Sequence, residues 1–558
     1  MANLSQERRE RMLAFLQTLK TQHTDDDSLM ALGEIEKELK AKKYGLVWEE
    51  HEEEVDVKMR THIPVFTVDE GMEIDGDLGS ERFNFLLEGD NLHSLRLLEK
   101  THRGRIDVIY IDPPYNTKNK DFVYNDCKVG DDDGFRHSKW ISFMEARLSI
   151  ASKLLSERGC IFISIDDNEQ AALKMLCDEV FGEDRFVALI PWRKRTAKSD
   201  VPFGISQDCE SILCYANPLF KAAIKGKERR YFETPDFPGR PWRFHDLTTQ
   251  RTVEERPNSN YTMINPRTKE EYPVNPLRCW AITIDTFQQY YDEHRVIFPG
   301  DYDFMKISKP VLRYWKEDDE AKAGSDFGLV AASTFLPSET VGMTQDGTKE
   351  VTEIFGSKKF SFPKPIGLIR YLIEIATVRT PDALVLDFFA GSGTTGQAVM
   401  ELNKEDGGQR RFILCTNNEN GICENVTYQR LKTVITGKRQ DGSEYSEGIP
   451  ANLMYFRTDF VDKESEELSE ELLEHIREMI QLEHGIKIDD QQYVIIMDDE
   501  EMDAFEQNFS SYTQLKAVFI NQDVFLSSSQ EEMLENVDSY IIPDYYFDFE
   551  LREAGEIW

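Results

Sequence analysis

Asp112, Pro113, Pro114 and Tyr115 are four consecutive residues whose types could hold an amine in place for reaction. The two prolines fix φ and remove two backbone donors, so the turn is rigid and presents acceptor oxygens. An exocyclic amine offers two hydrogens, which the Asp112 carboxylate and the Pro113 carbonyl can accept, so that the nitrogen lone pair is aimed at an electrophile. Tyr115 can stack on the ring that carries the amine. Alone, such a turn is as often structural as catalytic.

A second segment, residues 387–395, has the glycine spacing of a turn that binds a nucleoside. Gly391 and Gly393 are separated by one residue, between an expected strand and an expected helix, where the backbone can approach a ligand closely. The segment lacks the third glycine of a dinucleotide site and the Gly-Lys-Ser/Thr of a phosphate loop. The spacing therefore disfavours nicotinamide and ATP as the ligand.

The elements that must position both segments have the pattern of an α/β sheet. Residues 106–111 and 160–164 are apolar, β-branched runs typical of parallel strands buried on both faces, and residues 140–155 form one apolar helical face between them. A strand, a helix and a second strand imply a right-handed crossover in a doubly wound sheet. Further strands are expected at residues 383–386 and 412–415. Both motifs thus follow the carboxyl ends of strands, where such sheets bind ligands.

Changes in composition along the 558 residues predict five segments. We expect a doubly wound, mostly parallel α/β core, interrupted by an inserted domain rich in proline, aromatic and basic residues and followed by an acidic α+β domain. The expected bounds are 1–75 for a helical accessory segment, 76–217 for the catalytic half of the core, 218–360 for the insert, 361–440 for the cofactor half and 441–558 for the acidic C-terminal domain.

The formal net charge of −37 argues at first against a nucleic-acid partner, because phosphate binding depends on lysine and arginine. The charge is unevenly distributed, however. Residues 451–558 hold 28 acidic and 6 basic residues, so more than half of the excess lies in the last fifth of the chain. Elsewhere there are basic clusters at Arg193, Lys194, Arg195 and Lys198 and in residues 225–230. These clusters are either solvated faces or contacts to an anionic partner.

Neither a metal site nor a membrane segment is expected. The eight cysteines are scattered without Cys-x-x-Cys spacing, which indicates small buried residues in a reducing compartment. No apolar run of about 18 residues could span a bilayer. The first 20 residues carry charges where a secretory signal would need an apolar stretch. We therefore expect a cytoplasmic protein with no metal, no disulfide and no membrane partner.

Together the motifs resemble those of the β-class amino-methyltransferases, in which Asp-Pro-Pro-Tyr comes first, a target-recognition insert follows and Phe-x-Gly-x-Gly comes last. The order in this chain is the same. Similar motifs lie in residues 89–92, 362–365 and 411–414. The chain resembles most closely the DNA adenine-N6 modification (Mod) subunits of type III restriction-modification systems, through residues 43–49, 164–169 and 416–420. The resemblance covers about residues 40–440.

The resemblance implies S-adenosyl-L-methionine as the cofactor and assigns a role to each matching residue. Asp112, Pro113, Pro114 and Tyr115 would hold a target base that has been flipped out of the duplex. The implied cofactor contacts are Asp90 at the adenine, Lys364 and Pro365 over the methionine, Asp387 near the methionine, Phe389, Ala390, Gly391, Gly393 and Thr394 in the pocket wall, and Asn417 or Glu419 at the ribose.

The implied activity is methylation of the N6 amine of adenine in double-stranded DNA, within a restriction-modification or phage-defence system. N4-cytosine methylation is the nearest alternative, but the family usually has serine in place of Asp112 for that reaction. Asparagine there would favour a ribosomal-RNA or protein-glutamine methyltransferase. A non-catalytic DNA-binding or assembly module is disfavoured by the intact Asp112, Gly391 and Gly393.

The resemblance also suggests partners. The insert would read the DNA sequence, with Arg193, Lys194, Arg195 and Lys198 gripping phosphates at its entry. The acidic C-terminal domain cannot face phosphates, yet it is rich in apolar residues. We therefore expect it to be a folded assembly domain that forms a homodimer, with a restriction (Res) subunit as a second partner.

Overall fold

The computed structural model divides into two compact units, each of which is described by itself. The first unit contains residues 1–220, 335–370 and 382–558, and the second contains residues 221–334 and 371–381. The residues described are 4–23, 26–40, 51, 53–117, 123–124, 127–128, 136–196, 204–542, 546–547 and 550–552.

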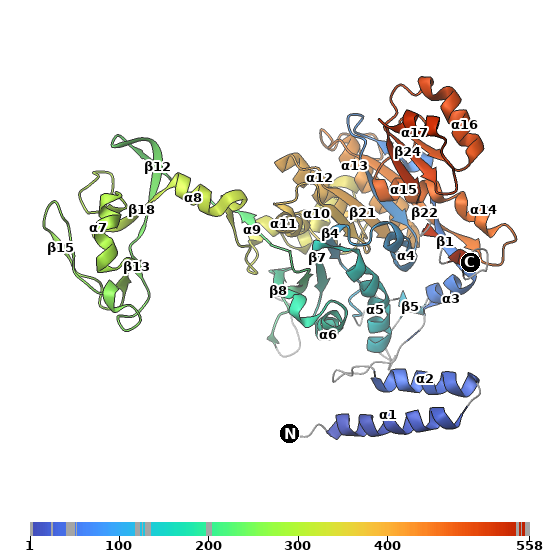
Figure 1. The fold of residues 1–558 in the computed structure, drawn as a ribbon, viewed down its shortest axis with the longest axis horizontal. Coiled ribbons are helices and arrows are strands. Elements are labelled where there is room, and N and C mark those ends of the chain that lie inside the picture. The colour runs from blue at the N-terminus through green and yellow to red at the C-terminus, as the bar shows by residue number, and fades with distance from the viewer. Residues whose placement is uncertain are drawn as a thin grey trace. The chain divides into compact units, whose positions relative to one another are not determined.

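A ten-stranded sheet forms the centre of the first unit (Figure 1). Its strand order is β1 (His62–Val68), β22 (Asn452–Asp462), β3 (Phe83–Glu88), β21 (Arg411–Thr416), β20 (Leu384–Asp387), β4 (Ile106–Ile111), β7 (Leu155–Ile165), β9 (Cys209–Ala216) and β8 (Phe186–Arg193), with β2 (Ile74–Asp75) also paired to β22. The strands from β22 across to β7 are parallel, whereas β1, β2, β9 and β8 pair in antiparallel fashion. This confirms the predicted doubly wound, mostly parallel sheet.

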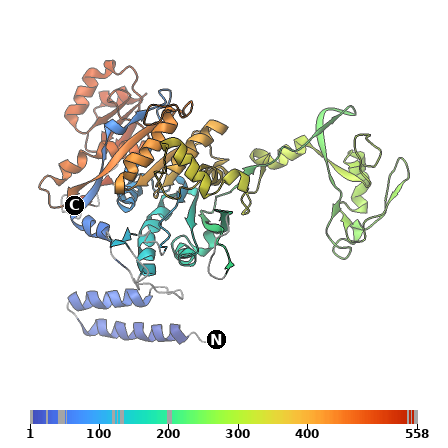
Figure 2. The same ribbon diagram turned by 180° about the vertical axis from the view of Figure 1, so that it is seen from behind.

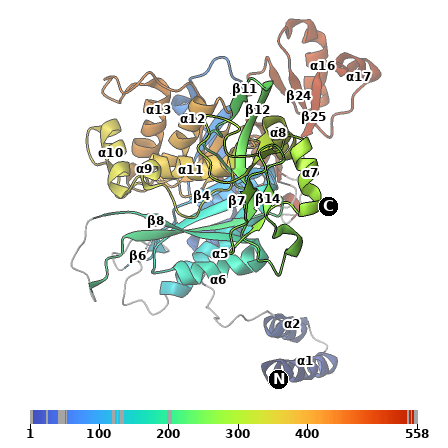
Figure 3. The ribbon, with the colours of Figure 1, turned by 90° about the vertical axis from the view of Figure 1, so that its left-hand side faces the viewer.

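Helices cover both faces of the sheet, as Figure 3 shows. One face carries α5 (Arg136–Leu154) and α6 (Gln170–Val180), and the other carries α12 (Thr394–Asp406) and α13 (Gln429–Thr436). The helix α4 (Asn91–Thr101) packs against α5. The central strands are therefore apolar on both sides, and Ile109, Ile111 and Leu386 have 0% of their surface exposed. The first unit also contains α9 (Ser338–Val341), α10 (Thr344–Phe355), β5 (Val123–Tyr124) and β6 (Cys127–Lys128). The helix α11 (Ile366–Thr377) begins in the first unit, and its residues from Tyr371 onward belong to the second.

The N-terminal segment differs from its expected bounds. It begins with the helices α1 (Leu4–Gln22), α2 (Asp26–Lys40) and α3 (Glu54–Thr61), as the charged, helix-forming sequence predicts. The strands β1 and β2, however, belong to the central sheet and not to a helical accessory segment that ends at residue 75. The apolar side chains of β1 explain this, because its buried run from Ile63 to Phe66 needs the partner strand β22.

The C-terminal region differs in two ways. β22 lies within the central sheet, so the expected boundary at residue 441 precedes a core strand. The rest is a parallel α/β layer and not an α+β domain, because helices connect the strands β23, β24 and β25 (red in Figures 1 and 2). Its elements are α14 (Leu468–Leu473), α15 (Ile476–His484), β23 (Tyr493–Ile496), α16 (Asp499–Asn508), β24 (Ala517–Asn521), α17 (Ser528–Leu534) and β25 (Asp538–Ile542).

The second unit is built on a four-stranded antiparallel sheet in the order β11 (Phe232–Thr234), β12 (Phe237–Asp246), β18 (Val311–Trp315) and β17 (Val296–Ile297). Two small aromatic cores hold it, one around Trp242 and Trp315 and the other around Trp280 and Phe298. It ends earlier than the expected 218–360, because α10 belongs to the first unit. The other elements are β10 (Ile224–Lys225), β13 (Thr248–Thr249), β14 (Met263–Ile264), β15 (Glu271–Tyr272), β16 (Cys279–Trp280), α7 (Ile284–Asp292), α8 (Lys316–Ala323) and β19 (Leu329–Val330).

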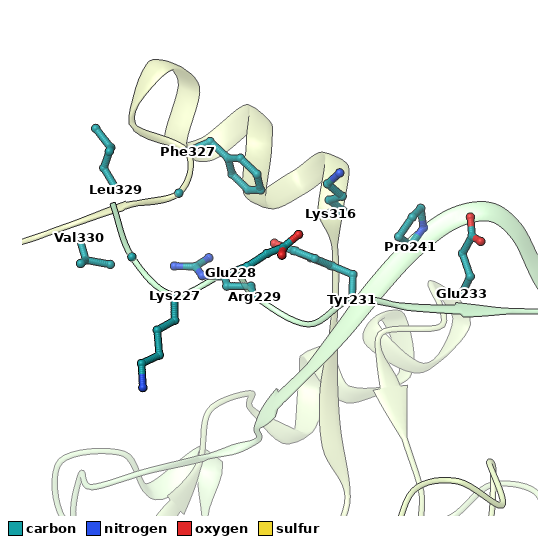
Figure 4. A pocket seen from close by; sticks show the side chains of 12 residues that line it. Lys227, Glu228, Arg229, Tyr231, Glu233, Pro241, Lys316, Phe327, Leu329 and Val330 are labelled. Atoms are coloured by element: carbon teal, nitrogen blue, oxygen red, sulfur yellow. The ribbon is translucent and has the colours of Figure 1, made fainter. Parts of the chain in front are cut away.

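A pocket of about 440 Å³ in this unit contains part of the basic cluster at residues 225–230 (Figure 4). Lys227, Arg229 and Lys316 line it beside Tyr231. Asp319 accepts hydrogen bonds from Tyr231 and Arg243 and lies 3.7 Å from the Arg229 guanidinium. The charge of Arg229 is therefore partly neutralised within the unit, by a carboxylate that it shares with Arg243.

Among the residues that the structure describes, no helix is long and apolar enough to cross a bilayer. Within the same residues, His, Cys, Asp and Glu side chains form no group that could hold a metal ion.

Candidate active site

The two motifs meet at one edge of the central sheet. β4 ends at Ile111 and β20 ends at Asp387, and the two strands are parallel neighbours with Leu386 opposite Ile109. Parallel neighbours bring their carboxyl ends to the same edge. The turn that begins at Asp112 and the glycine loop after β20 therefore lie side by side, although 275 residues separate Asp112 from Asp387.

A cavity of about 430 Å³ lies between these segments. Seven of the residues predicted from the sequence line it: Asp90, Asp112, Pro114, Phe389, Gly391, Asn417 and Glu419. Nine further residues complete the lining: Glu53, Glu54, Val55, Asn91, Phe143, Phe360, Phe388, Thr416 and Ile422. The cavity thus joins the turn after β4 to the glycine loop.

The glycine loop requires its glycines. Gly391 has φ +49° and Gly393 has φ +76°, a left-handed conformation that other residues adopt at a cost. A Cβ atom on Gly391 would lie 3.1 Å from Cζ of Phe360, and one on Gly393 would lie 3.2 Å from Cγ2 of Thr427. The Thr427 hydroxyl donates to the Gly391 carbonyl at 2.6 Å, which fixes the loop. The backbone therefore forms a cradle that a side chain would fill.

Asp387 holds this loop from within and does not line the cavity. Its carboxylate accepts hydrogen bonds from the backbone N–H of Phe389 at 3.0 Å and from the hydroxyl of Thr395. Burial raises the pKa of Asp387 to about 7. Ala390 and Thr394 also act in the loop, where the Ala390 N–H donates to the Cys415 carbonyl, and Thr394 donates to the Lys364 carbonyl.

In another part of the cavity wall, the buried side chain of Arg147 positions Asp90. Arg147 is fully buried and donates to both carboxylate oxygens of Glu53, at 2.7 and 3.1 Å, and to the Asn91 side chain at 2.6 Å. Its Nη2 also lies 3.4 Å from Oδ1 of Asp90, which in turn caps α4 by accepting from the Leu92 N–H. Burial raises the pKa of Glu53 against the lowering effect of Arg147. Asp90 and Glu53 thus place acceptor oxygens along one wall.

The residues after β21 supply the opposite polar wall. Asn417 and Glu419, the two alternatives for a ribose contact, both line the cavity. Asn418 does not, because its side-chain amide donates to Glu88 and its oxygen accepts the N–H groups of Cys423 and Glu424.

The turn after β4 is held rigidly. The Trp140 indole donates to the Pro114 carbonyl at 2.7 Å. Asn116 has φ +55° and is buried, and its amide donates to Glu169. The Tyr115 hydroxyl donates to Oδ1 of Asp112 at 2.8 Å. Asp112 is therefore presented from a fixed backbone.

Lys364 lies against this turn and is not among the residues that line the cavity. Its Nζ donates to both oxygens of Asp112 at 2.7 Å and to the Tyr115 hydroxyl at 2.8 Å. Burial alone would lower the pKa of Lys364, but the carboxylates of Asp112 and Glu210 raise it above its usual value. The side chain is therefore a charged ammonium that orients Asp112. Its neighbour Pro365 packs near Gly342.

Comparison with known proteins decides the family. A family model described as a DNA methylase matches residues 106–427, which is more than half of the chain. The chain belongs to this DNA methylase family. The match begins at β4 and ends at Thr427, in the π-helical turn Cys423–Tyr428 that packs on Gly393, so it contains both motifs.

Two curated relatives of this methylase are similar over about 60% of its length. The Mod subunit of the type III restriction-modification enzyme StyLTI from Salmonella typhimurium is 34% identical over 396 residues, which are 63% of this chain and 55% of that protein. The type II methyltransferase M.KpnI from Klebsiella pneumoniae is 32% identical over 367 residues, 61% of this chain and 82% of that protein. The methylase therefore matches little more than half of the length of StyLTI Mod.

Solved structures are more distant. The crystal structure of M1.HpyAVI is 16% identical, with a TM-score of 0.28, and the match covers 62% of this chain and 98% of that one. The PvuII DNA methyltransferase, titled cytosine-N4-specific, is 13% identical with a TM-score of 0.31 over 66% and 98% of the two chains.

The predicted phosphate-binding residues have different surroundings in the methylase. Arg193 is exposed at the end of β8. Arg195 donates to the Gln207 carbonyl at 3.1 Å. Lys194 instead points inward, and its Nζ lies 3.2 Å from Oε1 of Glu210, because the two adjacent strands β8 and β9 bring these side chains together. Lys198 lies outside the described residues.

Sequence reasoning missed three charged residues of the site: Glu53, Arg147 and Glu210. Arg147 carried a usable signal, because it interrupts the apolar helical face of residues 140–155 and a buried arginine requires an acidic partner. The sequence could not show which acid that partner is. Glu210 gave no signal, since it lies in a strand without a motif.

Proposed function

We propose that this chain transfers a methyl group from S-adenosyl-L-methionine to the N6 amine of an adenine in double-stranded DNA. The observation that carries the proposal is that Asp112 and Gly391, one from each motif, line the same cavity. Membership of the DNA methylase family and the names of the relatives, which are Mod subunits and a type II methyltransferase, support it.

The cavity suits the cofactor in size and in chemistry. Its volume of about 430 Å³ falls within the roughly 300–1,000 Å³ of small-molecule sites. The backbone cradle at Gly391 leaves room for close approach, and the rings of Phe143, Phe360 and Phe389 offer apolar surface for a nucleoside. The carboxylates of Asp90 and Glu419 can accept hydrogen bonds from an ammonium or a ribose. Bound there, the cofactor would supply an electrophilic sulfonium methyl group.

The protein's own part is to hold and orient the target amine. Asp112 and the Pro113 carbonyl would accept the two amine hydrogens, so that the nitrogen lone pair faces the electrophile. As the new N–C bond forms, the bond between the methyl carbon and sulfur would break and leave a neutral thioether, and the amine would give up one proton to the Asp112 carboxylate. The Tyr115 hydroxyl is engaged with Asp112, which leaves its ring to contact the base.

A base inside a duplex cannot reach this cavity, so the adenine must be flipped out. The cost of unstacking and unpairing is about a few kcal/mol and would be offset by contacts in the pocket. The second compact unit would read the surrounding sequence, and Arg193 and Arg195 of the first unit would contact phosphates.

Partners are proposed on the same basis. The Mod names of several relatives support a type III system, in which this chain would work with a restriction (Res) subunit. We expect a homodimer formed through the C-terminal layer of β23, β24 and β25. This layer leaves Phe525 85% exposed and Ile541 61% exposed, and a second copy of the chain would cover these apolar side chains.

One experiment tests the activity and the modified atom together. Purified chain is incubated with S-adenosyl-L-methionine that carries a labelled methyl group and with unmethylated genomic DNA, and the DNA is then sequenced on a single-molecule platform. We expect label in the DNA and N6-methyladenine at one sequence motif. N4-methylcytosine would move the assignment to the alternative amine, and unlabelled DNA at every cofactor and salt concentration would refute the proposal.

A further inference from the structure

Asp112 belongs to a buried cluster of charged groups that includes a second carboxylate, Glu210. Glu210 lies in β9, outside every motif of the sequence. Its Oε2 accepts from the Tyr115 hydroxyl at 3.1 Å and lies 3.5 Å from Nζ of Lys364. Its Oε1 lies 3.2 Å from Nζ of Lys194. Two carboxylates therefore share one buried ammonium and one phenol.

In the structure, Asp112 has little capacity left for a further donor. A carboxylate has about four acceptor positions, two on each oxygen. Oδ1 already accepts from Lys364 and from Tyr115, and Oδ2 accepts from Lys364. Only one acceptor position, on Oδ2, remains. An incoming amine must therefore share Oδ2 with the Lys364 ammonium, which places the amine nitrogen beside a positive charge.

Glu210 offers that ammonium a second acceptor within reach. The Lys364 nitrogen is 2.7 Å from Asp112 and 3.5 Å from Glu210, so a movement of less than about one ångström transfers its main contact from one to the other. Burial would raise the pKa of Glu210, but Lys364 and Lys194 lower it overall, so Glu210 is an anion. The Tyr115 phenol has one hydrogen and can likewise donate to either carboxylate.

We propose that Glu210 is a positioning residue, which takes over the Lys364 ammonium when the target amine binds and so frees Asp112 to accept it. This inference rests on the proposed methyl transfer. The charges of the cluster support it, because Asp112 and Glu210 balance Lys364 and Lys194. Without Glu210, Asp112 would be the remaining carboxylate partner of Lys364 among the described residues, so the ammonium would stay on Asp112.

Other ionisable groups also face the cluster. Tyr110 lies on β4, and its pKa is raised well above the usual value by burial, with Asp112 and Glu210 adding to the effect. Asp387 is near enough for Asp112 to raise its pKa further, although burial is the main cause. Neither group is hydrogen-bonded to Lys364 in the structure, so Glu210 is the alternative acceptor within the described residues.

The test is Glu210→Gln, which keeps the shape and removes the charge. We expect kcat to fall at least about tenfold, because a catalytic group that is wrongly placed costs up to about a hundredfold. The Kd for S-adenosyl-L-methionine, measured by calorimetry, should change by less than about twofold, since Glu210 does not line the cavity. Glu210→Asp, which restores the charge, should recover part of kcat.

A matched control exists in α6, a helix that packs on β9. Asp178 accepts both from Lys174, at 2.6 Å, and from the Tyr215 hydroxyl, at 2.8 Å. This is another carboxylate that shares a lysine and a tyrosine, and it does not line the cavity. Asp178→Asn should change the melting temperature without changing kcat. An equal loss of kcat in Asp178→Asn and Glu210→Gln would reduce Glu210 to a structural residue.

A double variant tests whether Glu210 acts as the second acceptor for the Lys364 ammonium or only balances the charge of the cluster. Glu210→Gln combined with Lys194→Met restores neutrality but still leaves Lys364 without a second acceptor. We expect kcat to stay low in the double variant. Recovery to the wild-type kcat would overturn the proposal, as would a Glu210→Gln enzyme within about twofold of wild type. If the wild-type chain transfers no methyl group to DNA, the proposed function is refuted, and this inference, which rests on it, is refuted as well.

Discussion

Replacement of Gly391 by valine is the change that most directly tests the cofactor site. Gly391 lines the cavity at φ +49°, and a Cβ atom there would lie 3.1 Å from Cζ of Phe360. Carbon atoms prefer a separation of about 3.5–4.0 Å, so either the loop or the Phe360 ring must move. Both lie on the cavity wall, and either movement reduces the space for the cofactor.

The magnitude has two parts. The left-handed backbone costs any residue with a Cβ atom about 1–2 kcal/mol, which lowers stability but does not involve the ligand. The two γ-carbons of valine add a steric effect that does involve the ligand. We expect the Kd for S-adenosyl-L-methionine to rise at least about tenfold, which corresponds to roughly 1.4 kcal/mol of binding free energy.

Gly407 provides the control. It has φ +73° at the end of α12, and an added Cβ atom would meet nothing within 4 Å. Gly407→Val should therefore lose similar stability in thermal unfolding and bind the cofactor normally in calorimetry. If Gly391→Val bound S-adenosyl-L-methionine with wild-type affinity, the assignment of the cavity to the cofactor would be refuted.

Four further predictions follow from the same structure. Asp112→Ala should abolish methyl transfer in the labelling assay but leave cofactor affinity within about twofold, since the residue holds the amine; a matching loss of affinity would contradict this role. Charge removal at Arg193 and Arg195 should weaken binding to all DNA alike and reduce the slope of log affinity against log salt by about 2, whereas a changed sequence preference would mean base contacts. The raised pKa of Asp387 means that the folded state holds its proton more tightly than the unfolded state, so stability should fall as the pH rises from about 4 to 7. Asp387→Asn should flatten that part of the curve of unfolding free energy against pH, and an unchanged curve would exclude Asp387 as its source. Truncation after Asp490, which spares β22, should turn a dimer into a monomer in light scattering; a monomeric full-length chain would disprove assembly through this layer.

The sequence predicts the active-site edge of the sheet because the information there is local. The apolar run that ends at Ile111 and the one that ends at Leu386 each lead directly into a motif, and parallel pairing then places both motifs at one edge. The strands β1 and β22 are harder to predict. Neither strand leads into a motif. The two strands pair with each other although they are far apart in the sequence, with Val68 opposite Phe456. Their pairing depends on tertiary contacts that no periodicity reveals.

The same distinction holds for the side chains of the site. The motif residues Asp112 and Gly391 are recognisable from their neighbours in the chain. Lys194 was expected on a phosphate because it lies in a basic cluster, yet Glu210 across the β8–β9 pair attracts it inward. A cluster of charged residues in a sequence shows only the local composition. Strand register decides which opposite charge each of these side chains contacts.

The position of β22 has a consequence for how the chain is made. β22 lies between β1 and β3 in the sheet, but 383 residues separate Val68 from Asn452 along the chain. At about 5–20 residues per second, β1 and one edge of β3 would wait roughly 20 to 80 seconds on the ribosome before their shared neighbour is synthesised. During that time an apolar strand edge stays open to wrong partners. Completion of the sheet is therefore a late event in synthesis, and a ribosome that stalls before Asn452 would release a chain prone to aggregate.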